Sequence, residues 1–235
     1  MKQYRILIFL VSVIIYSQRV QSFLPASTCV VSLGSNCRVA TWLRALNIRT
    51  KAYPFDWVES EDINALIHLI KNDFEGYLEF EKLAPAYNYF YNRVIDTTYK
   101  INFVHDFSFQ GNERFSFANA VDYDYGLMCL KQEYGKFYEK YMRRIQRFRA
   151  LTKKYEQIIF VRTLLVDKTT AQELYAALQL LFNNSQKIIL VVISDQEDFK
   201  NDWHIRGIKN FYLPREHLIT DGYERAFKHI LMDIF

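Results

Sequence analysis

The C-terminal third of the chain alternates between two hydrophobic patterns. Residues 158–165 and 187–194 are continuous apolar runs, whereas residues 169–182 carry apolar side chains at helical spacing. Residues 210–213 and 221–232 extend the alternation with a third strand and a closing helix. Continuous apolar strands separated by helices are typical of a parallel sheet that is buried on both faces. The pattern therefore predicts a single α/β domain with a mainly parallel sheet flanked by helices.

The same pattern begins near the N-terminus. Residues 28–32 form a short apolar run, and apolar positions at helical spacing follow it in residues 37–47. Two more helices are predicted, over residues 63–72 and residues 126–154. Residues 74–127 are aromatic, polar and weakly periodic. We expect short strands and long loops there, including a strand over residues 101–107.

The first 22 residues have the layout of a secretory signal peptide. Lys2 and Arg5 precede an apolar run over residues 6–16, and Val20-Gln21-Ser22 offers a cleavage region before Phe23. The apolar run is short for a membrane span. The sequence therefore predicts a secreted or periplasmic domain of residues 23–235. An anchor through residues 6–16 is the alternative, and the only membrane contact expected.

Removal of this segment changes the charge. The formal net charge falls from +4 to +1, because 27 basic residues then face 26 acidic ones. A basic helix face over residues 136–149 could bind phosphate or RNA, but such faces are more often solvated. The sequence makes no strong case for a nucleic-acid partner. It also lacks the spacings typical of metal sites and of dinucleotide or nucleotide loops, so no metal and no cofactor are predicted.

Cys37 is the leading candidate for chemistry. It lies where the strand of residues 28–32 gives way to a helix, and Gly34 can adopt the positive φ of a sharp turn. A thiol at a helix N-terminus next to Arg38 is expected to favour the thiolate. The alternative is that Cys37 is a small buried apolar residue.

The cysteine count bears on this assignment. An exported protein with three cysteines leaves at least one thiol unpaired. A disulfide between Cys29 and Cys129 would leave Cys37 free, although sequence alone does not establish that pairing.

His105 follows an apolar run at a predicted strand end and could act as base and partner for Cys37. Asp106 is poorly placed to orient its ring, because adjacent strand residues point to opposite faces. Asp56 is the alternative orienting residue. His105 could equally be an ordinary core or loop histidine.

Arg162 lies inside an apolar strand and has two interpretations. It could hold an anionic or carbonyl group beyond the strand ends, with Ser35 in the turn before Cys37. It could instead form a structural ion pair with Asp167 or Asp195. The first interpretation supports a second function, a non-peptidase transferase or a module that binds an anionic ligand.

Several motifs occur in order along the chain. They are Ser-Leu-Gly-Ser-Asn-Cys-Arg-Val-Ala at 32–40, Leu-Arg at 43–44, Tyr-Pro-Phe-Asp-Trp at 53–57, His-Asp-Phe at 105–107, Tyr-Met-Arg-Arg-Ile-Gln-Arg-Phe at 141–148 and Phe-Val-Arg at 160–162. Together they resemble a family of unknown function whose members are called papain-like cysteine peptidases, over roughly residues 28–213.

The resemblance implies that Cys37 is a nucleophile and His105 its partner. A cysteine hydrolase of this type would attack the carbonyl of a peptide or another acyl substrate. Asp56 or Asp106 would orient the imidazole, and the Asn36 side chain would help the Cys37 N–H to stabilise the oxyanion. Papain-like folds place the histidine on an antiparallel sheet. An α+β papain-like fold is therefore the alternative to the parallel α/β prediction.

Overall fold

The computed structural model describes residues 24–49, 51–87, 92–110, 120–164, 166–185, 187–215 and 224–234. The predicted signal segment, residues 1–22, lies outside these ranges. Within them, no helix combines the length and the apolar character needed to cross a bilayer.

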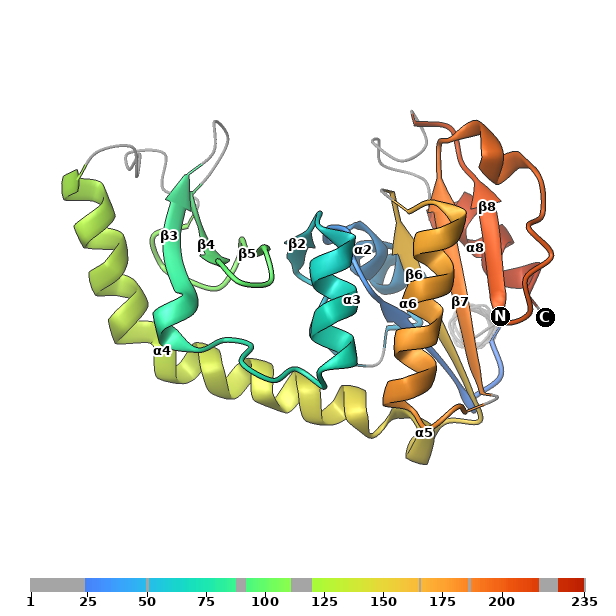
Figure 1. Cartoon of the computed structure of the whole chain (residues 1–235), viewed down its shortest axis with the longest axis horizontal. Helices are drawn as coiled ribbons and strands as arrows, with labels where there is room; N and C mark the ends of the chain where they lie inside the picture. The colour runs from blue at the N-terminus through green and yellow to red at the C-terminus, as the bar shows by residue number, and fades with distance from the viewer. Residues whose placement is uncertain are drawn as a thin grey trace, which may run out of the picture.

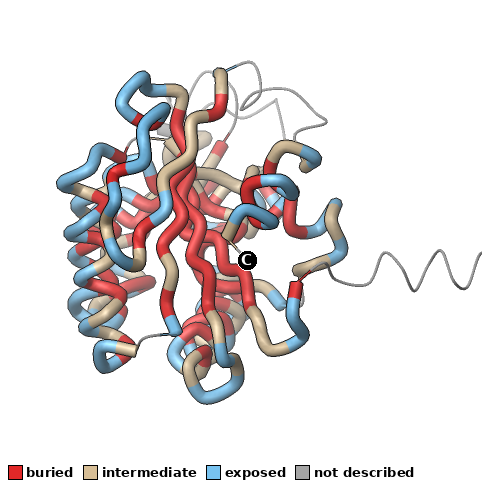
Figure 2. The backbone as a smooth tube through the Cα atoms, turned by 90° about the vertical axis from the view of Figure 1, so that its right-hand side faces the viewer, coloured by how far each residue is buried: buried red, intermediate tan, exposed pale blue. Residues whose placement is uncertain are grey.

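A four-stranded parallel sheet forms one side of the molecule (Figure 1). In spatial order its strands are β1 (Thr28–Ser32), β6 (Gln157–Thr163), β7 (Ile188–Ser194) and β8 (Ile208–Tyr212). Figure 2 shows these strands as a buried centre with exposed residues on the surrounding helices. The continuous apolar runs produce this burial, because a strand with helices on both faces has no solvent side. The predicted parallel sheet is confirmed.

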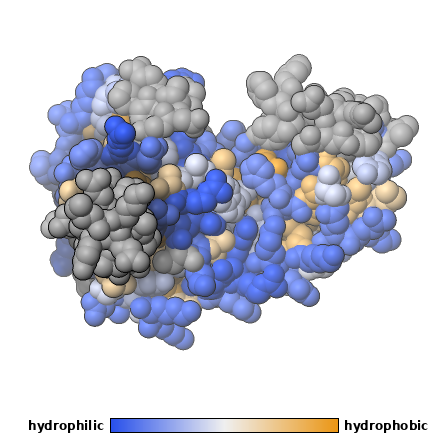
Figure 3. Space-filling model, turned by 180° about the vertical axis from the view of Figure 1, so that it is seen from behind, coloured by the Kyte–Doolittle hydropathy of each residue, from blue (hydrophilic) through white to orange (hydrophobic). Residues whose placement is uncertain are grey.

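Helices cover both faces of this sheet. On one face lie α2 (Arg38–Ala45) and α8 (Glu224–Met232), whose Trp42 and Phe227 rings pack 5.1 Å apart. On the other face lie α3 (Ile63–Lys71) and α6 (Lys168–Leu181). Asp62 caps α3 by accepting a hydrogen bond from the Ala65 N–H. Seen from the side of α2 and α8, the described surface is mostly hydrophilic (Figure 3).

The middle of the chain builds a second, antiparallel sheet. In spatial order its strands are β2 (Val58–Ser60), β5 (Ile101–Phe103), β4 (Asn92–Asp96) and β3 (Leu83–Tyr87). One face packs on α4 (Ala120–Arg149), where the Phe103 ring lies 4.8 Å from that of Phe137. The fold is therefore mixed α/β, with one parallel and one antiparallel sheet.

The bounds of several elements differ from the expectation, most of all in the middle of the chain. The strand predicted over residues 101–107 ends at Phe103, because the Gln110 side chain accepts hydrogen bonds from the N–H groups of Asp106 and Phe107 and turns the chain. The long helix predicted over residues 126–154 begins at Ala120 and ends at Arg149, and a separate turn of helix, α5 (Leu151–Lys154), follows it. Two 3₁₀ turns complete the described elements. They are η1 (Phe80–Lys82) and η2 (Glu197–Lys200).

Candidate functional site

The turn between β1 and α2 lies where the two sheets meet. The Leu33 N–H donates to the Val161 carbonyl at 2.8 Å, which continues the parallel ladder into the turn. Gly34 has a φ of +86°, and a Cβ atom there would lie 2.6 Å from the Ser60 Oγ. The Ser60 N–H donates to the Ser35 carbonyl at 2.7 Å. Only glycine fits this conformation and this contact, so the turn positions Cys37 rigidly.

Arg162, on β6, holds this turn through hydrogen bonds. Its side chain is completely buried, and its Nη1 donates to the Leu33 carbonyl and to the Ser60 Oγ, both at 2.7 Å. Its Nη2 donates to the Ser60 carbonyl. Burial lowers the pKa of Arg162 to about 9. The guanidinium therefore ties the turn that follows β1 to β2 of the other sheet.

Neither interpretation of Arg162 from the sequence describes these contacts. Its partners are carbonyls and a hydroxyl rather than Asp167 or Asp195, and Asp167 instead caps α6 through the Thr170 N–H. The Arg162 side chain has no exposed surface at which to meet a ligand, and Ser35 is 4% exposed. The anion site expected at Ser35 and Arg162 is therefore closed by the packing of the turn.

Cys37 is half-buried at the N-cap position of α2. Burial raises the pKa of its thiol, and the Glu59 carboxylate raises it further. The Cys37 backbone N–H and the Arg38 charge lower this pKa, but they do not outweigh burial. The expectation of a favoured thiolate is corrected here, because it left out the desolvation of the turn.

Removing the Glu59 charge is expected to lower the Cys37 pKa. Glu59→Gln deletes a negative charge that disfavours the thiolate, so more thiolate is present at neutral pH and alkylation by iodoacetamide becomes several-fold faster. The rate of Cys37 alkylation against pH, followed by peptide mass mapping, measures this shift. Glu173→Gln, on the exposed surface of α6, is the matched control. An unchanged or higher Cys37 pKa in Glu59→Gln would contradict the interpretation that the Glu59 charge raises it.

Asn36 holds the start of α2. Its Oδ1 accepts a hydrogen bond from the Arg38 N–H at 3.0 Å. This bond satisfies one of the free donors at the helix end. The amide oxygen is therefore engaged, and an oxyanion role for Asn36 would fall to its Nδ2.

The three cysteines are free thiols. The Cys29 Sγ lies 3.3 Å from the hydroxyl oxygen of Tyr53, within the core around the parallel sheet. Cys129 lies on α4, one turn after Tyr125, with whose hydroxyl it is hydrogen-bonded. The possible disulfide between Cys29 and Cys129 is therefore not formed, because each sulfur packs against a different tyrosine on a different element.

The two predicted orienting carboxylates have other partners. The Asp56 Oδ2 accepts from the Arg49 Nε at 3.1 Å and Nη2 at 2.9 Å, and also from the Tyr53 N–H. Burial raises the pKa of Asp56, and Arg49 opposes that rise. Asp106 is ion-paired with Lys140, and its Oδ2 accepts from the Tyr141 hydroxyl at 2.9 Å.

His105 is exposed, and its ring centre lies 6.4 Å from that of Trp57. The register of β2 and β5 pairs Val58 with Phe103, so His105 lies beyond the Val58 end of β2. The Ser60 end of the same strand meets the turn of Cys37. Trp57 and Ser60 are separated by about 10 Å of extended chain. Among the described residues, no hydrogen bond joins Cys37 to His105, and their pairing stays a prediction.

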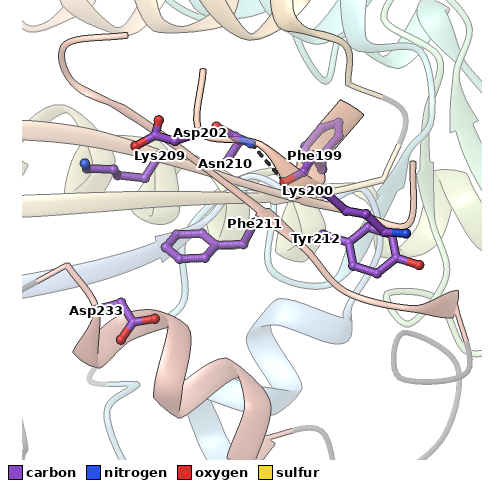
Figure 4. A pocket seen from close by; sticks show the side chains of 8 residues that line it. All are labelled: Phe199, Lys200, Asp202, Lys209, Asn210, Phe211, Tyr212 and Asp233. Atoms are coloured by element: carbon purple, nitrogen blue, oxygen red, sulfur yellow. Dashed lines mark hydrogen bonds between the residues drawn. The ribbon is translucent and has the colours of Figure 1, made fainter. Parts of the chain in front are cut away.

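A cavity of about 410 Å³ lies elsewhere, beside the edge strand β8. Its lining comprises Phe199, Lys200, Asp202, Lys209, Asn210, Phe211, Tyr212 and Asp233 (Figure 4). Cys37 follows β1, which forms the opposite edge of the parallel sheet. This cavity therefore does not belong to the candidate site. The described residues also contain no cluster of three histidine, cysteine or acidic side chains that could hold a metal ion.

Sequence reasoning missed Glu59 as a neighbour of Cys37 and missed the environment of Trp57. The guanidinium carbons of Arg44 and Arg49 lie 5.4 and 5.1 Å from the centre of the Trp57 ring. The signal was present in the Tyr-Pro-Phe-Asp-Trp motif, whose tryptophan had no assigned role.

Residues 28–196 match the family described as “Putative papain-like cysteine peptidase”, and the chain belongs to this family. The chain is also 30% identical, over 136 residues, to an uncharacterised protein of Acanthamoeba polyphaga mimivirus. That alignment covers 57% of this chain and 61% of the viral protein. No solved structure matches the chain. The family range includes Cys37, His105 and Arg162.

Proposed function

We propose that this protein is a cysteine hydrolase in which the Cys37 thiol attacks the carbonyl of a peptide or another acyl substrate. The observation that carries the proposal is the position of Cys37, half-buried at the start of α2 on a turn that Gly34 and Arg162 make rigid. A nucleophile must be accessible and held in one geometry, and this thiol meets both needs. Membership of the peptidase family supports the same reaction class.

The raised pKa of Cys37 defines what the reaction requires. The resting group is the neutral thiol, so a base must take its proton as sulfur attacks the carbonyl carbon. His105 would accept this proton and pass it to the leaving amine or alcohol when the acyl group forms a thioester with Cys37. A water molecule would then give a proton to His105 and attack the thioester carbonyl, and His105 would return that proton to the departing Cys37 sulfur as the carboxylic acid is released. The Cys37 N–H and the Asn36 Nδ2 would stabilise the oxyanion in both steps.

The surroundings of His105 support this role. The ring is exposed beside Trp57, and the next residue, Asp106, is anchored by Lys140 and by the Tyr141 hydroxyl. Asp106 would therefore steady the backbone at His105 rather than bind the imidazole. This mechanism requires that substrate binding bring His105 to Cys37 from the Val58 end of β2, because about 10 Å of extended chain separates Trp57 from Ser60.

Covalent trapping tests the proposal. Short peptides that end in a vinyl sulfone, which reacts with activated thiols, are incubated with the folded protein and the adduct is mapped by mass spectrometry. We expect the adduct on Cys37, with the buried Cys29 and Cys129 unmodified until the protein unfolds. Folded protein in which Cys37 stays unmodified, or reacts no faster than a free cysteine peptide of equal thiol pKa, would remove the basis for a nucleophilic Cys37.

We also propose that the protein is exported, with cleavage before Phe23. The support is the order of basic, apolar and small residues in residues 1–22. N-terminal sequencing of the protein from the medium or the periplasm checks this, and an intact Met1 in the membrane fraction would favour the anchor instead.

A further inference from the structure

Trp57 is the centre of a basic cluster on the surface beside α2. The guanidinium carbons of Arg44 and Arg49 lie 5.4 and 5.1 Å from its ring centre, which is the range of cation–π contacts. The His105 ring approaches the same indole edge-on at 6.4 Å. We call Trp57, Arg44 and Arg49 the Trp57 cluster and leave out His105, the proposed base.

The Trp57 cluster is positively charged and partly fixed in position. The Asp56 side chain is 1% exposed and binds Arg49 through both Nε and Nη2. That pair is neutral, so the charge of Arg44 is left over. Arg44 is exposed, and the contact that the structure gives its guanidinium is the Trp57 ring. Among the described residues no carboxylate is paired with Arg44, so the cluster presents to solvent an arginine that the Trp57 ring holds in place.

One stripe of α2 connects the cluster to the nucleophile. Cys37, Thr41 and Arg44 are spaced four and three residues apart, which places them on one side of the helix. The opposite side, with Val39, Trp42 and Leu43, is buried against the parallel sheet. Seven residues of helix span about 10 Å, so Arg44 lies about that far from Cys37 along the stripe.

Strand β2 and the residue before it, Trp57, lie next to this stripe of α2. The Glu59 carboxylate acts on the Cys37 thiol, and Trp57, two residues earlier, carries Arg44. The two elements thus run alongside each other from the thiol to the Trp57 cluster. An extended peptide that occupies this path advances about 3.3 Å per residue and reaches the cluster about three residues from the attacked carbonyl.

We propose that the Trp57 cluster is a specificity site that binds an acidic side chain of the peptide substrate. Arg44 would hold the carboxylate with its planar fork of donors, and Trp57 would keep the guanidinium in place. The inference rests on the proposed function of Cys37 and adds the substrate class to it. Charge complementarity selects glutamate or aspartate at this distance, and Glu59 near Cys37 disfavours a carboxylate closer to the thiol.

The test uses paired vinyl sulfone peptides that differ by one glutamate or glutamine, placed two, three or four residues from the reactive group. We expect one glutamate peptide to label Cys37 at least tenfold faster than its glutamine twin, with the advantage shrinking as salt is raised. Arg44→Gln is expected to remove the advantage. Lys131→Gln, which removes an exposed positive charge on α4, is expected to retain it.

A second measurement does not depend on chemistry at Cys37. Binding of the same peptides, without the reactive group, to the Cys37→Ala protein is followed by tryptophan fluorescence. Tighter binding of the glutamate peptide in Cys37→Ala, lost in Cys37→Ala with Arg44→Gln, supports the inference. Equal binding of the two peptides overturns it, even if Cys37 is labelled. Labelling that fails while the binding difference remains would count against the nucleophile and not against the acidic-side-chain site.

Discussion

Arg162→Met is expected to lower the free energy of unfolding by about 3–5 kcal/mol. The substitution removes the donors for the Leu33 carbonyl, the Ser60 carbonyl and the Ser60 hydroxyl, all of them at the junction of the two sheets. Each acceptor left unpaired in the interior costs about 1–3 kcal/mol. Removing a charge that is itself costly to bury offsets part of that loss. Urea denaturation at constant pH measures the difference.

Two controls separate the hydrogen bonds from the charge. Arg162→Lys keeps a positive charge but loses the planar fork of donors that reaches both Leu33 and Ser60. We therefore expect its free energy of unfolding to fall measurably, but by less than in Arg162→Met. Arg143→Met removes an arginine whose pair with Glu139 is on the surface, and should change stability by no more than about 0.5 kcal/mol. A loss below about 1 kcal/mol for Arg162→Met would show that these bonds do not hold the turn.

The parallel sheet was predictable because its signals are local. Each strand is a continuous apolar run, and each neighbouring helix has its own periodicity, so no knowledge of distant residues was needed. The same applies to the turn before Cys37. A glycine between an apolar strand and a helix indicates a sharp turn, and the structure gives Gly34 a φ of +86°.

The antiparallel sheet depends on contacts that sequence does not display. Its strands β2 and β5 are three residues long, too short to show an alternating pattern. The end of β5 is set by the Gln110 side chain seven residues after Phe103. Sequence reasoning could place short strands in this region, but it could not give their register or their order.

The candidate site was predictable in the same uneven way. The position of Cys37 followed from local patterns, but its pKa depends on burial and on Glu59, which β2 brings from more than twenty residues away. A charged residue inside an apolar strand could serve a ligand or the fold, and only the contacts of Arg162 with Leu33 and Ser60 decide for the fold. Asp56 was a candidate to orient the His105 imidazole, but its partner is Arg49. No pattern in the sequence indicated that Arg49 would pair with Asp56.

Cys37→Ser is expected to reduce turnover at least about 10³-fold, because a serine hydroxyl is a far weaker nucleophile at a site built for sulfur. His105→Ala removes the proposed base and should reduce turnover by about 10²–10⁴-fold. Cys37→Ser changes one atom of a half-buried side chain and His105 is exposed, so the melting temperature of each variant is expected to stay within a few degrees of wild type. Steady-state assays on the best peptide found by trapping, together with thermal unfolding, measure the two effects.

Cys129→Ser is the matched control for the loss of a thiol. Cys129 is a buried residue of α4, so Cys129→Ser should lower stability while the folded fraction keeps its turnover. The opposite pattern, early unfolding of Cys37→Ser and His105→Ala with turnover intact, would make both residues structural. The double variant is informative as well. If Cys37 and His105 act in one proton transfer, their joint loss should cost little more than the loss of Cys37 alone, because residues that act as a unit are not additive.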